Sequence, residues 1–280
     1  MIRLAVRCRP EHAEAVLPDL LELAPNGVEE ERGPGFVECA IYGGPGEVPE
    51  LGELKAAAGE ALVEVSATAV PDDWADRWAD FHKPIEVANR IRVRPSWEPP
   101  EGELIDVVVD PGQAFGTGAH PTTRLCLELL VELAGGGAAA GSDAAPLGPL
   151  ADWGTGSGVL AIAAAKLGWE PVIACDRETA ALEAAAANAG VNGVELELAG
   201  VDVREQAPPV APTVVANLTA PLLEECARQL RGGSERPRDL VCSGMLLREA
   251  DTVAAGLIAG GLSVRQRRVE GDWAALLLSS

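Results

Sequence analysis

The chain has 280 residues, of which 48% are hydrophobic and 23% are charged, a balance typical of a folded globular protein rather than a disordered or fibrous one. Its formal net charge of −21 disfavours direct binding to the phosphate backbone of a nucleic acid. The charge fits either a soluble or salt-adapted surface or the attraction of a basic macromolecule, and composition leaves both interpretations open.

The first seventy residues are predicted to form a small domain in which strands and helices alternate. The order is strand, helix, two strands, helix and strand, which is typical of a ferredoxin-like α+β domain. The pattern favours strands at 2–8 and 61–70, a hairpin at 27–42, and helices at 10–24 and 49–60.

A connector is expected next along the chain. Trp74, Trp78 and Phe81 lie three or four positions apart, so they form one stripe of a helix, and packing is the usual role of such a stripe. Short extended segments then lead into a long helix at about 121–133. Residues 134–149 are rich in Gly and Ala and cannot bury enough surface to fold alone, so a flexible surface loop is predicted there.

From about residue 150 onwards, strands alternate with helices. This alternation indicates an α/β domain with a doubly wound, mostly parallel sheet and helices on both of its faces. In such sheets ligands bind beyond the carboxyl ends of the strands. The polar residues that follow these strands are therefore the candidates for a functional site.

A glycine-rich turn is the first candidate. Residues 149–169 begin as a strand, continue with three glycines spaced GxGxG, and end as a strongly apolar helix. Gly154 and Gly156 lack Cβ atoms, so the backbone can turn tightly and approach a bound nucleoside. Dinucleotide enzymes have a similar pattern, but this spacing, with Asp152 two residues earlier, suits a methionine and a ribose better than a pyrophosphate.

Asp176 ends the next apolar strand, eighteen residues after Gly158. A carboxylate at the tip of this second strand can accept hydrogen bonds from both hydroxyls of a ribose. The glycine turn and the acid together favour a nucleoside cofactor over the alternative, a purely structural turn.

Asn217 is the third candidate, because the apolar strand that starts at Thr213 delivers it to the expected cleft. Its carbonyl can accept a hydrogen bond from an incoming amine, whose lone pair is then aimed at a methyl carbon. The competing interpretation is a turn or a helix cap before Thr219. Because the glycine turn and Asp176 occur in the same chain, the functional interpretation of Asn217 is favoured.

The segment at 110–123, DPGQAFGTGAHPTT, is too dense in Gly and Thr to serve mainly for packing, and it leads directly into a helix. A loop with Phe115 and Thr117 in it could fold over a ligand and exclude water, since loops of this kind usually carry function. The alternative is a glycine-rich turn with Phe115 as a core anchor. We interpret His120, near the helix start, as satisfying a local hydrogen bond.

The sequence also excludes several classes of protein. No run of eighteen apolar residues occurs and the N-terminus has charges inside its apolar stretch, so we predict neither a membrane span nor a secretory signal, and expect a cytoplasmic protein. The six cysteines are scattered without a CxxC pair, so they are expected to be reduced core residues. With only three histidines, we predict no metal centre.

Taken together, these segments resemble one family closely, the methyltransferases that act on ribosomal protein eleven of the large subunit. DPGQAFGTGAHPTT resembles the signature of that family, and DWGTGSGVLAIAAAKLG, NLTAP, CSGML and GDWAALLL follow in its order and spacing. The connector, FHKPIEVANRIRVRPSWEPP, is also similar to the linker of the family. The resemblance covers residues 71–280, whereas over the first seventy residues it depends on length and pattern alone. The chain departs from the family in its longer Gly/Ala loop and at Thr219.

The resemblance implies S-adenosylmethionine as cofactor and a Rossmann-like sheet of seven strands. By motif position it implies that four residues contact the cofactor, Thr123, Gly154, Asp176 and Asn217, and Gly156 belongs to the same turn. It also implies three segments, namely a substrate-recognition domain at 1–70, a linker at 71–95 and a methyltransferase domain at 96–280. Thirteen acids and five bases in the first seventy residues suit a basic partner.

The implied reaction is methylation of amino groups on the ribosomal protein, at lysine side chains and with the N-terminal amine as a further candidate. We expect Asn217, Phe115 and Thr117 to orient the amine and water to accept its proton, because desolvation and proximity lower the barrier without a dedicated base. The alternatives are a methyltransferase of the same fold acting on another amine, an amide or a nucleic-acid base, and a non-catalytic cofactor-binding module. The absence of an aromatic residue just after Asn217 counts against a planar acceptor.

Overall fold

The computed structural model describes most of the chain, and the following account is limited to that part: residues 2–12, 16, 20, 29–33, 35–43, 49, 54, 59, 62–69, 83–109, 120–135 and 147–280. The chain divides into two compact units, residues 1–81 with 112–114 and residues 82–111 with 115–280. The predicted helix with Trp74, Trp78 and Phe81 lies outside the described residues, as does most of the predicted Gly/Ala loop. The functional division at residues 70 and 95 stays a prediction.

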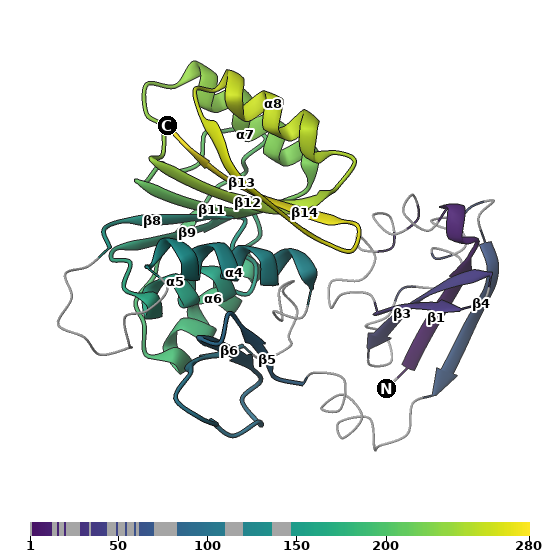
Figure 1. Cartoon of the computed structure of the whole chain (residues 1–280). Helices are drawn as coiled ribbons and strands as arrows, with labels where there is room; N and C mark the ends of the chain where they lie inside the picture. The colour runs from purple at the N-terminus through teal and green to yellow at the C-terminus, as the bar shows by residue number, and fades with distance from the viewer. Residues whose placement is uncertain are drawn as a thin grey trace. The chain divides into compact units, whose positions relative to one another are not determined.

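The first unit contains an antiparallel sheet in the order β2-β3-β1-β4, which is the strand order of a ferredoxin-like domain and confirms that prediction. Figure 1 labels β3, β1 and β4 of this sheet. Its elements are β1 (Ile2–Cys8), η1 (Pro10–His12), β2 (Glu29–Gly33), β3 (Phe36–Gly43) and β4 (Leu62–Ala69). Alternate residues of β1 point into a small core with Leu20 and Leu54, two fully buried helical residues.

The second unit begins with a small sheet of three strands, β5 (Ile85–Val87), β6 (Ile91–Arg94) and β7 (Ile105–Val108). β5 and β6 are antiparallel, whereas β6 and β7 are parallel and joined by the loop at 95–104. Buried valines and isoleucines of these strands pack into the core that also contains helix α4 (Pro121–Leu133). This helix has the bounds that the sequence predicts.

The main sheet has seven strands in the order β10-β9-β8-β11-β12-β14-β13. These are β8 (Leu150–Trp153), β9 (Val172–Asp176), β10 (Glu197–Gly200), β11 (Thr213–Asn217), β12 (Asp239–Leu246), β13 (Ser263–Glu270) and β14 (Trp273–Ser279). All pairs are parallel except those made by β14, which runs antiparallel to both of its neighbours. The predicted doubly wound, mostly parallel sheet is therefore confirmed.

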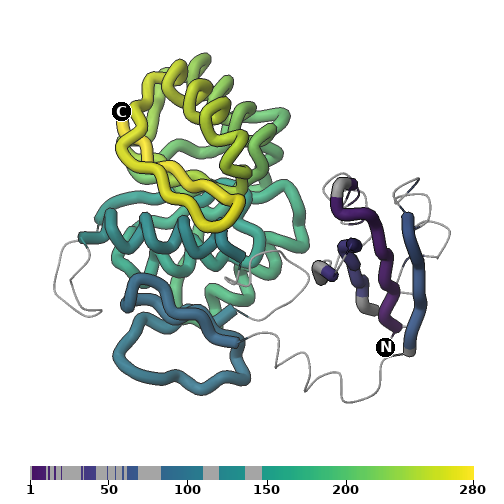
Figure 2. The backbone as a smooth tube through the Cα atoms, turned by 45° about the vertical axis from the view of Figure 1, so that its right-hand side comes forward, coloured from purple at the N-terminus to yellow at the C-terminus, as the bar shows by residue number. Residues whose placement is uncertain are grey.

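Helices cover both faces of this sheet (Figures 1 and 2). On one face lie α4, α5 (Val159–Leu167) and α6 (Thr179–Asn192), and on the other lie α7 (Ala220–Gly232) and α8 (Ala250–Ala259). Strand residues alternate between the two cores, with Leu150 in one and Ala151 in the other, because successive side chains of a strand point to opposite faces. None of the described helices is long and apolar enough to span a membrane.

All six cysteines are buried and none of them forms a disulfide, as the sequence predicts. Burial raises the pKa of the Cys175, Cys226 and Cys242 thiols to about 12. Since the thiolate is the reactive form, these side chains behave as small apolar core residues.

Candidate functional site

The strand order creates a topological switch point at the carboxyl ends of β8 and β11, where doubly wound sheets form a ligand-binding crevice. These two strands are neighbours, yet the helix that follows β8 covers one face of the sheet and the helix that follows β11 covers the other. The two chain segments therefore part at this point, which is where doubly wound sheets bind ligands. Gly154 follows β8 and Asn217 ends β11, so the sequence-predicted residues lie at the two sides of the crevice.

The glycine turn between β8 and α5 requires glycine for two separate reasons. Gly154 has a φ of +72°, and a Cβ atom on it would lie 2.3 Å from Cδ2 of Leu218, the residue after Asn217. Gly156 also has a positive φ, of +54°. The backbone N–H groups of Gly154 and Thr155 both donate to the Cys175 carbonyl at 2.9 Å, which ties the turn to β9. The turn is thus close to both neighbouring strands.

Asp176 ends β9 with its carboxylate fixed against the glycine turn. Its Oδ2 accepts a hydrogen bond from the N–H of Gly156 at 3.0 Å, and its Oδ1 accepts one from the N–H of Glu178 at 3.1 Å. Each carboxylate oxygen can accept more than one hydrogen bond, so both keep capacity for hydroxyl donors from a ligand. The fold brings Asp176 and Gly156 together although twenty residues separate them.

Asp152 lies beneath this turn and is completely buried. Its Oδ2 accepts a hydrogen bond from the Thr155 hydroxyl at 2.7 Å. Burial raises the pKa of Asp152 to about 7, against the lowering effect of the hydrogen bonds from Thr155 and the Ala161 amide. Near neutral pH the protonated and ionised forms of this carboxyl are therefore both populated.

Asn217 is oriented by a residue from a distant part of the chain. Its Nδ2 donates a hydrogen bond to Oγ1 of Thr123 at 3.2 Å, and Thr123 is fully buried in the first turn of α4. Because the amide nitrogen is engaged in this way, the carbonyl oxygen of Asn217 is the end of the side chain that can accept a hydrogen bond from a ligand. Two of the predicted residues are thus brought into direct contact.

His120 has the local role that the sequence indicates. It is the N-cap of α4, where its Nδ1 accepts a hydrogen bond from the N–H of Thr122 at 3.3 Å and lies 2.7 Å from the Thr122 hydroxyl. Its ring meets that of Trp273 edge-on, with centroids 4.7 Å apart. The cap supports the helix turn that carries Thr123.

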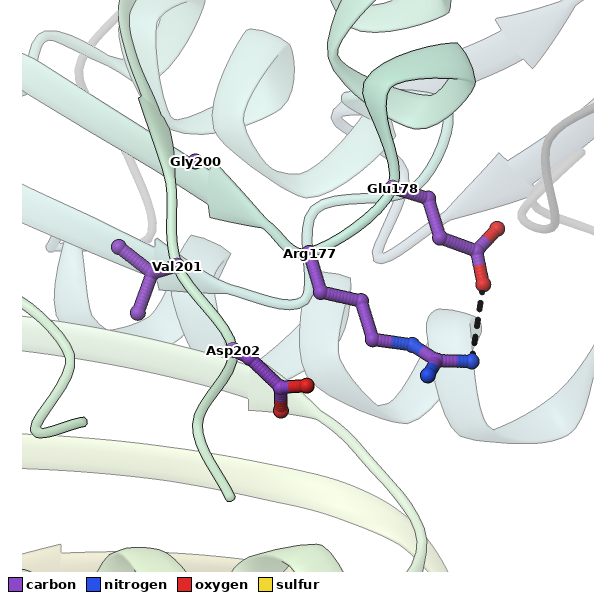
Figure 3. Close-up of a pocket in the computed structure, with 5 residues that line it drawn as sticks. All are labelled: Arg177, Glu178, Gly200, Val201 and Asp202. Atoms are coloured by element: carbon purple, nitrogen blue, oxygen red, sulfur yellow. Dashed lines mark hydrogen bonds and ion pairs between the residues drawn. The ribbon is translucent and has the colours of Figure 1, made fainter. Parts of the chain in front are cut away.

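A hollow beyond Asp176 was not anticipated from the sequence. It is lined by Arg177, Glu178, Gly200, Val201 and Asp202, at the carboxyl ends of β9 and β10 (Figure 3). Arg204 holds the carboxylate of Asp202 through side-chain and backbone hydrogen bonds, which lower the pKa of Asp202 to about 2. An acid two residues after the third strand of the sheet in chain order was a signal that could have identified this hollow.

Gly244 fixes the backbone beside Asn217. It lies at an irregularity in β12, has a φ of +90°, and a Cβ atom on it would come within 2.3 Å of the Leu218 carbonyl oxygen. The N–H of Leu218 donates to the Ser243 carbonyl at 3.0 Å, so the two segments cannot separate without losing that bond. A side chain at this position would displace the residue that follows Asn217.

We therefore expect Gly244→Ala to lower the free energy of unfolding by about 2 to 4 kcal/mol, from the strain of a positive φ together with backbone overpacking. Gly271→Ala is the matched control, because Gly271 also has a positive φ, of +57°, but nothing within 4 Å of its Cβ position. Urea denaturation of both variants measures the difference. Equal losses would show that the close approach of Leu218 contributes nothing.

Two predicted residues cannot be placed, because Phe115 and Thr117 lie outside the described residues. Their proposed role in orienting an amine stays a prediction. Within the part of the chain that the structure describes, no group of three or more histidine, cysteine or acidic side chains could hold a metal ion.

Comparisons with known proteins agree on one family. A profile of the family "Ribosomal protein L11 methyltransferase (PrmA)" matches residues 48–280. Proteins named ribosomal protein L11 methyltransferase are similar to the chain. One from Pelotomaculum thermopropionicum is 38% identical over 78% of this chain and 69% of its own length. Another, from Pseudomonas fluorescens, is 39% identical over 76% of this chain and 70% of its own length. A crystal structure of a ribosomal protein L11 methylase from Lactobacillus delbrueckii subsp. bulgaricus matches with a TM-score of 0.60 and 27% identity, over 71% of this chain and 98% of that one.

Proposed function

The chain belongs to the ribosomal protein L11 methyltransferase family, and from that premise we propose that it transfers methyl groups from S-adenosylmethionine to amino groups of ribosomal protein L11. The acceptors are lysine side chains, with the N-terminal amine as a further candidate. Ribosomal proteins are made and assembled in the cytoplasm of bacteria, so we propose that compartment for the reaction.

The observation that carries this proposal is the contact between Asn217 and Thr123. It leaves the carbonyl oxygen of Asn217 as the acceptor that an incoming amine can meet, at the end of β11 and beside the glycine turn. An amine that donates one hydrogen to this oxygen is held with its lone pair directed elsewhere, toward the methyl donor. A water-poor crevice also favours the neutral amine, because desolvation lowers the pKa of an ammonium group.

The residues around the crevice fit S-adenosylmethionine, which supplies an activated methyl group when it is bound. The absence of a Cβ atom at Gly154 keeps the turn open at a place where any side chain would meet Leu218. Asp176 offers charged acceptors for ribose hydroxyls, and the next residue in the chain, Arg177, lines the hollow together with Asp202. We propose that this hollow takes the nucleobase and that Thr123 and Gly156 complete the cofactor site.

Replacement of Asp176 by alanine is expected to weaken the binding of S-adenosylmethionine by about 1.5 to 3 kcal/mol, because the ribose hydroxyls lose a charged acceptor. Isothermal titration calorimetry gives the affinity directly. Glu183→Ala is the control, since it removes an exposed carboxylate of α6 that does not line the hollow and leaves that of Asp176 in place. Unchanged affinity in Asp176→Ala would mean that another residue binds the ribose.

Intact-mass spectrometry of purified ribosomal protein L11, after incubation with enzyme and S-adenosylmethionine, tests the proposed function. Mass increments of whole methyl groups are expected, and peptide fragmentation then assigns them to lysine side chains or the N-terminus. No increment despite measurable cofactor binding would favour a methyltransferase with another acceptor. No binding of the cofactor would contradict the enzyme altogether and favour a non-catalytic module.

A further inference from the structure

The loop between β6 and β7, residues 95–104, is held in place by two buried arginines. Nη1 of Arg92 donates to the Pro99 carbonyl at 2.9 Å, and Nη1 of Arg94 donates to the Glu98 carbonyl at 2.6 Å. The side chains of these arginines are only 6% and 10% exposed. Burying a guanidinium group is costly unless it is hydrogen-bonded, so the two arginines favour one conformation of the loop.

This ordered loop presents Trp97 to the solvent. The residue is 43% exposed, whereas Trp153 and Trp169 are buried and Trp273 is half-buried. In Figures 1 and 2 the loop that follows β6 extends away from the main sheet as a wide blue turn. The two arginines bond to backbone carbonyls of the loop and not to the indole, so a change of the Trp97 ring leaves the partners of both hydrogen bonds in place.

The loop that contains Trp97 is acidic in sequence. Residues 95–104 contain the three glutamates at 98, 101 and 103 and no lysine or arginine, and none occurs as far as residue 123. Glu101 is 82% exposed although it contacts Arg92 at 3.3 Å, and Glu103 is exposed as well. An indole face beside carboxylates attracts lysine and arginine side chains through cation–π and ionic interactions.

The loop and the last residues of β7 lie at the same end of the small sheet. β6 and β7 are parallel, and the carbonyl of Arg94 accepts a hydrogen bond from the N–H of Val109 at 2.9 Å. The loop therefore leaves the small sheet at the end where β7 finishes, from which the chain continues toward Phe115 and Thr117.

We propose that Trp97, with Glu98 and Glu103, forms a docking surface for a lysine-rich segment of the protein substrate. The inference depends on the proposed function, because a ribosomal protein binds RNA phosphates through lysine and arginine and so supplies such a segment. The docking surface is separate from the amine-orienting group at Asn217 and contributes affinity for the substrate, not chemistry.

Steady-state kinetics of Trp97→Ala test the proposal. KM for ribosomal protein L11 is expected to rise about three- to thirtyfold, the range of a cation–π contact from exposed to desolvated, while kcat and the affinity for S-adenosylmethionine stay unchanged. Trp97→Phe should recover part of the loss, because phenylalanine keeps an aromatic face. The double variant Glu98→Gln with Glu103→Gln should raise KM at low salt and weaken its dependence on salt.

The matched controls are Ile258→Ala, which removes an exposed apolar side chain from α8, and Glu183→Gln, which removes an exposed charge from α6. Both should leave KM unchanged. If KM is the same in Trp97→Ala as in the wild type while L11 is methylated, the docking surface is refuted and the proposed function stands. If calorimetry shows that L11 binds more weakly to Trp97→Ala but is never methylated, the docking surface stands and the proposed function fails.

Discussion

Asn217→Ala is expected to slow methyl transfer by about a hundredfold or more while S-adenosylmethionine binds with nearly unchanged affinity. The removal of a single well-placed polar group from a water-poor site typically has an effect of this size on the rate. The carbonyl of Asn217 is needed chiefly when the amine is aligned, because its amide nitrogen is already engaged with Thr123. Single-turnover rates with saturating cofactor measure the chemical step without product release.

Asn217→Asp is the matched variant, because it keeps an acceptor oxygen and adds a negative charge. A carboxylate beside an amine favours the ammonium form and raises its pKa, so a smaller fraction of the acceptor is neutral at a given pH. Raising the pH should therefore recover the rate of Asn217→Asp more than that of Asn217→Ala. Equal rates in the wild type and both variants at every pH would show that another group orients the amine.

Deletion of residues 1–70 is expected to abolish methylation of ribosomal protein L11 and to leave the binding of S-adenosylmethionine intact. The four strands of the first unit form their own sheet and core, and among the described residues they pair with no strand of the second unit. Domains of this kind can usually fold separately. In this prediction the acidic first seventy residues bind the basic substrate, and the crevice at β8 and β11 binds the cofactor without them.

Calorimetry with S-adenosylmethionine shows first whether the truncated protein is folded, and intact-mass analysis of L11 then measures its activity. Full activity of the truncated protein on intact L11 would refute the assignment of substrate recognition to one domain and methyl transfer to the other. Loss of both activity and cofactor binding would contradict the expectation that residues 71–280 fold alone. Retained binding with lost activity is the predicted outcome.

Short-range patterns in the sequence were sufficient to identify most elements of the fold and the carboxyl ends of the strands at the candidate site. The strand at 172–176 and the helix at 121–133 follow from apolar runs and helical spacing, which depend on neighbouring residues only. Because ligands of doubly wound sheets bind at carboxyl ends, these patterns also single out Asp176 and Asn217. Their chemical roles are still predictions.

The hollow at Asp202 was missed for a physical reason. Asp202 lies 26 residues after Asp176, and their strand ends are neighbours only because β10 pairs with β9 in a register that sets Gly200 opposite Asp176. The local repeat of apolar residues predicts a strand but does not show which distant strand it pairs with. The sequence therefore shows the acid but not its neighbours. The close approach of Gly244 to Leu218 was invisible for the same reason.

By itself, the sequence determined the two-domain α/β organisation, the glycine turn and the polar residues at the strand ends, because each depends on residues within a few positions of one another. Only the tertiary structure decided that the amide nitrogen of Asn217 donates to Thr123, because this partner is 94 residues away in the chain. It likewise decided that Trp97 is presented to the solvent, because that exposure depends on how Arg92 and Arg94 hold the loop. A hydrogen bond between distant segments forms only after the chain has packed, so a local sequence pattern cannot predict it.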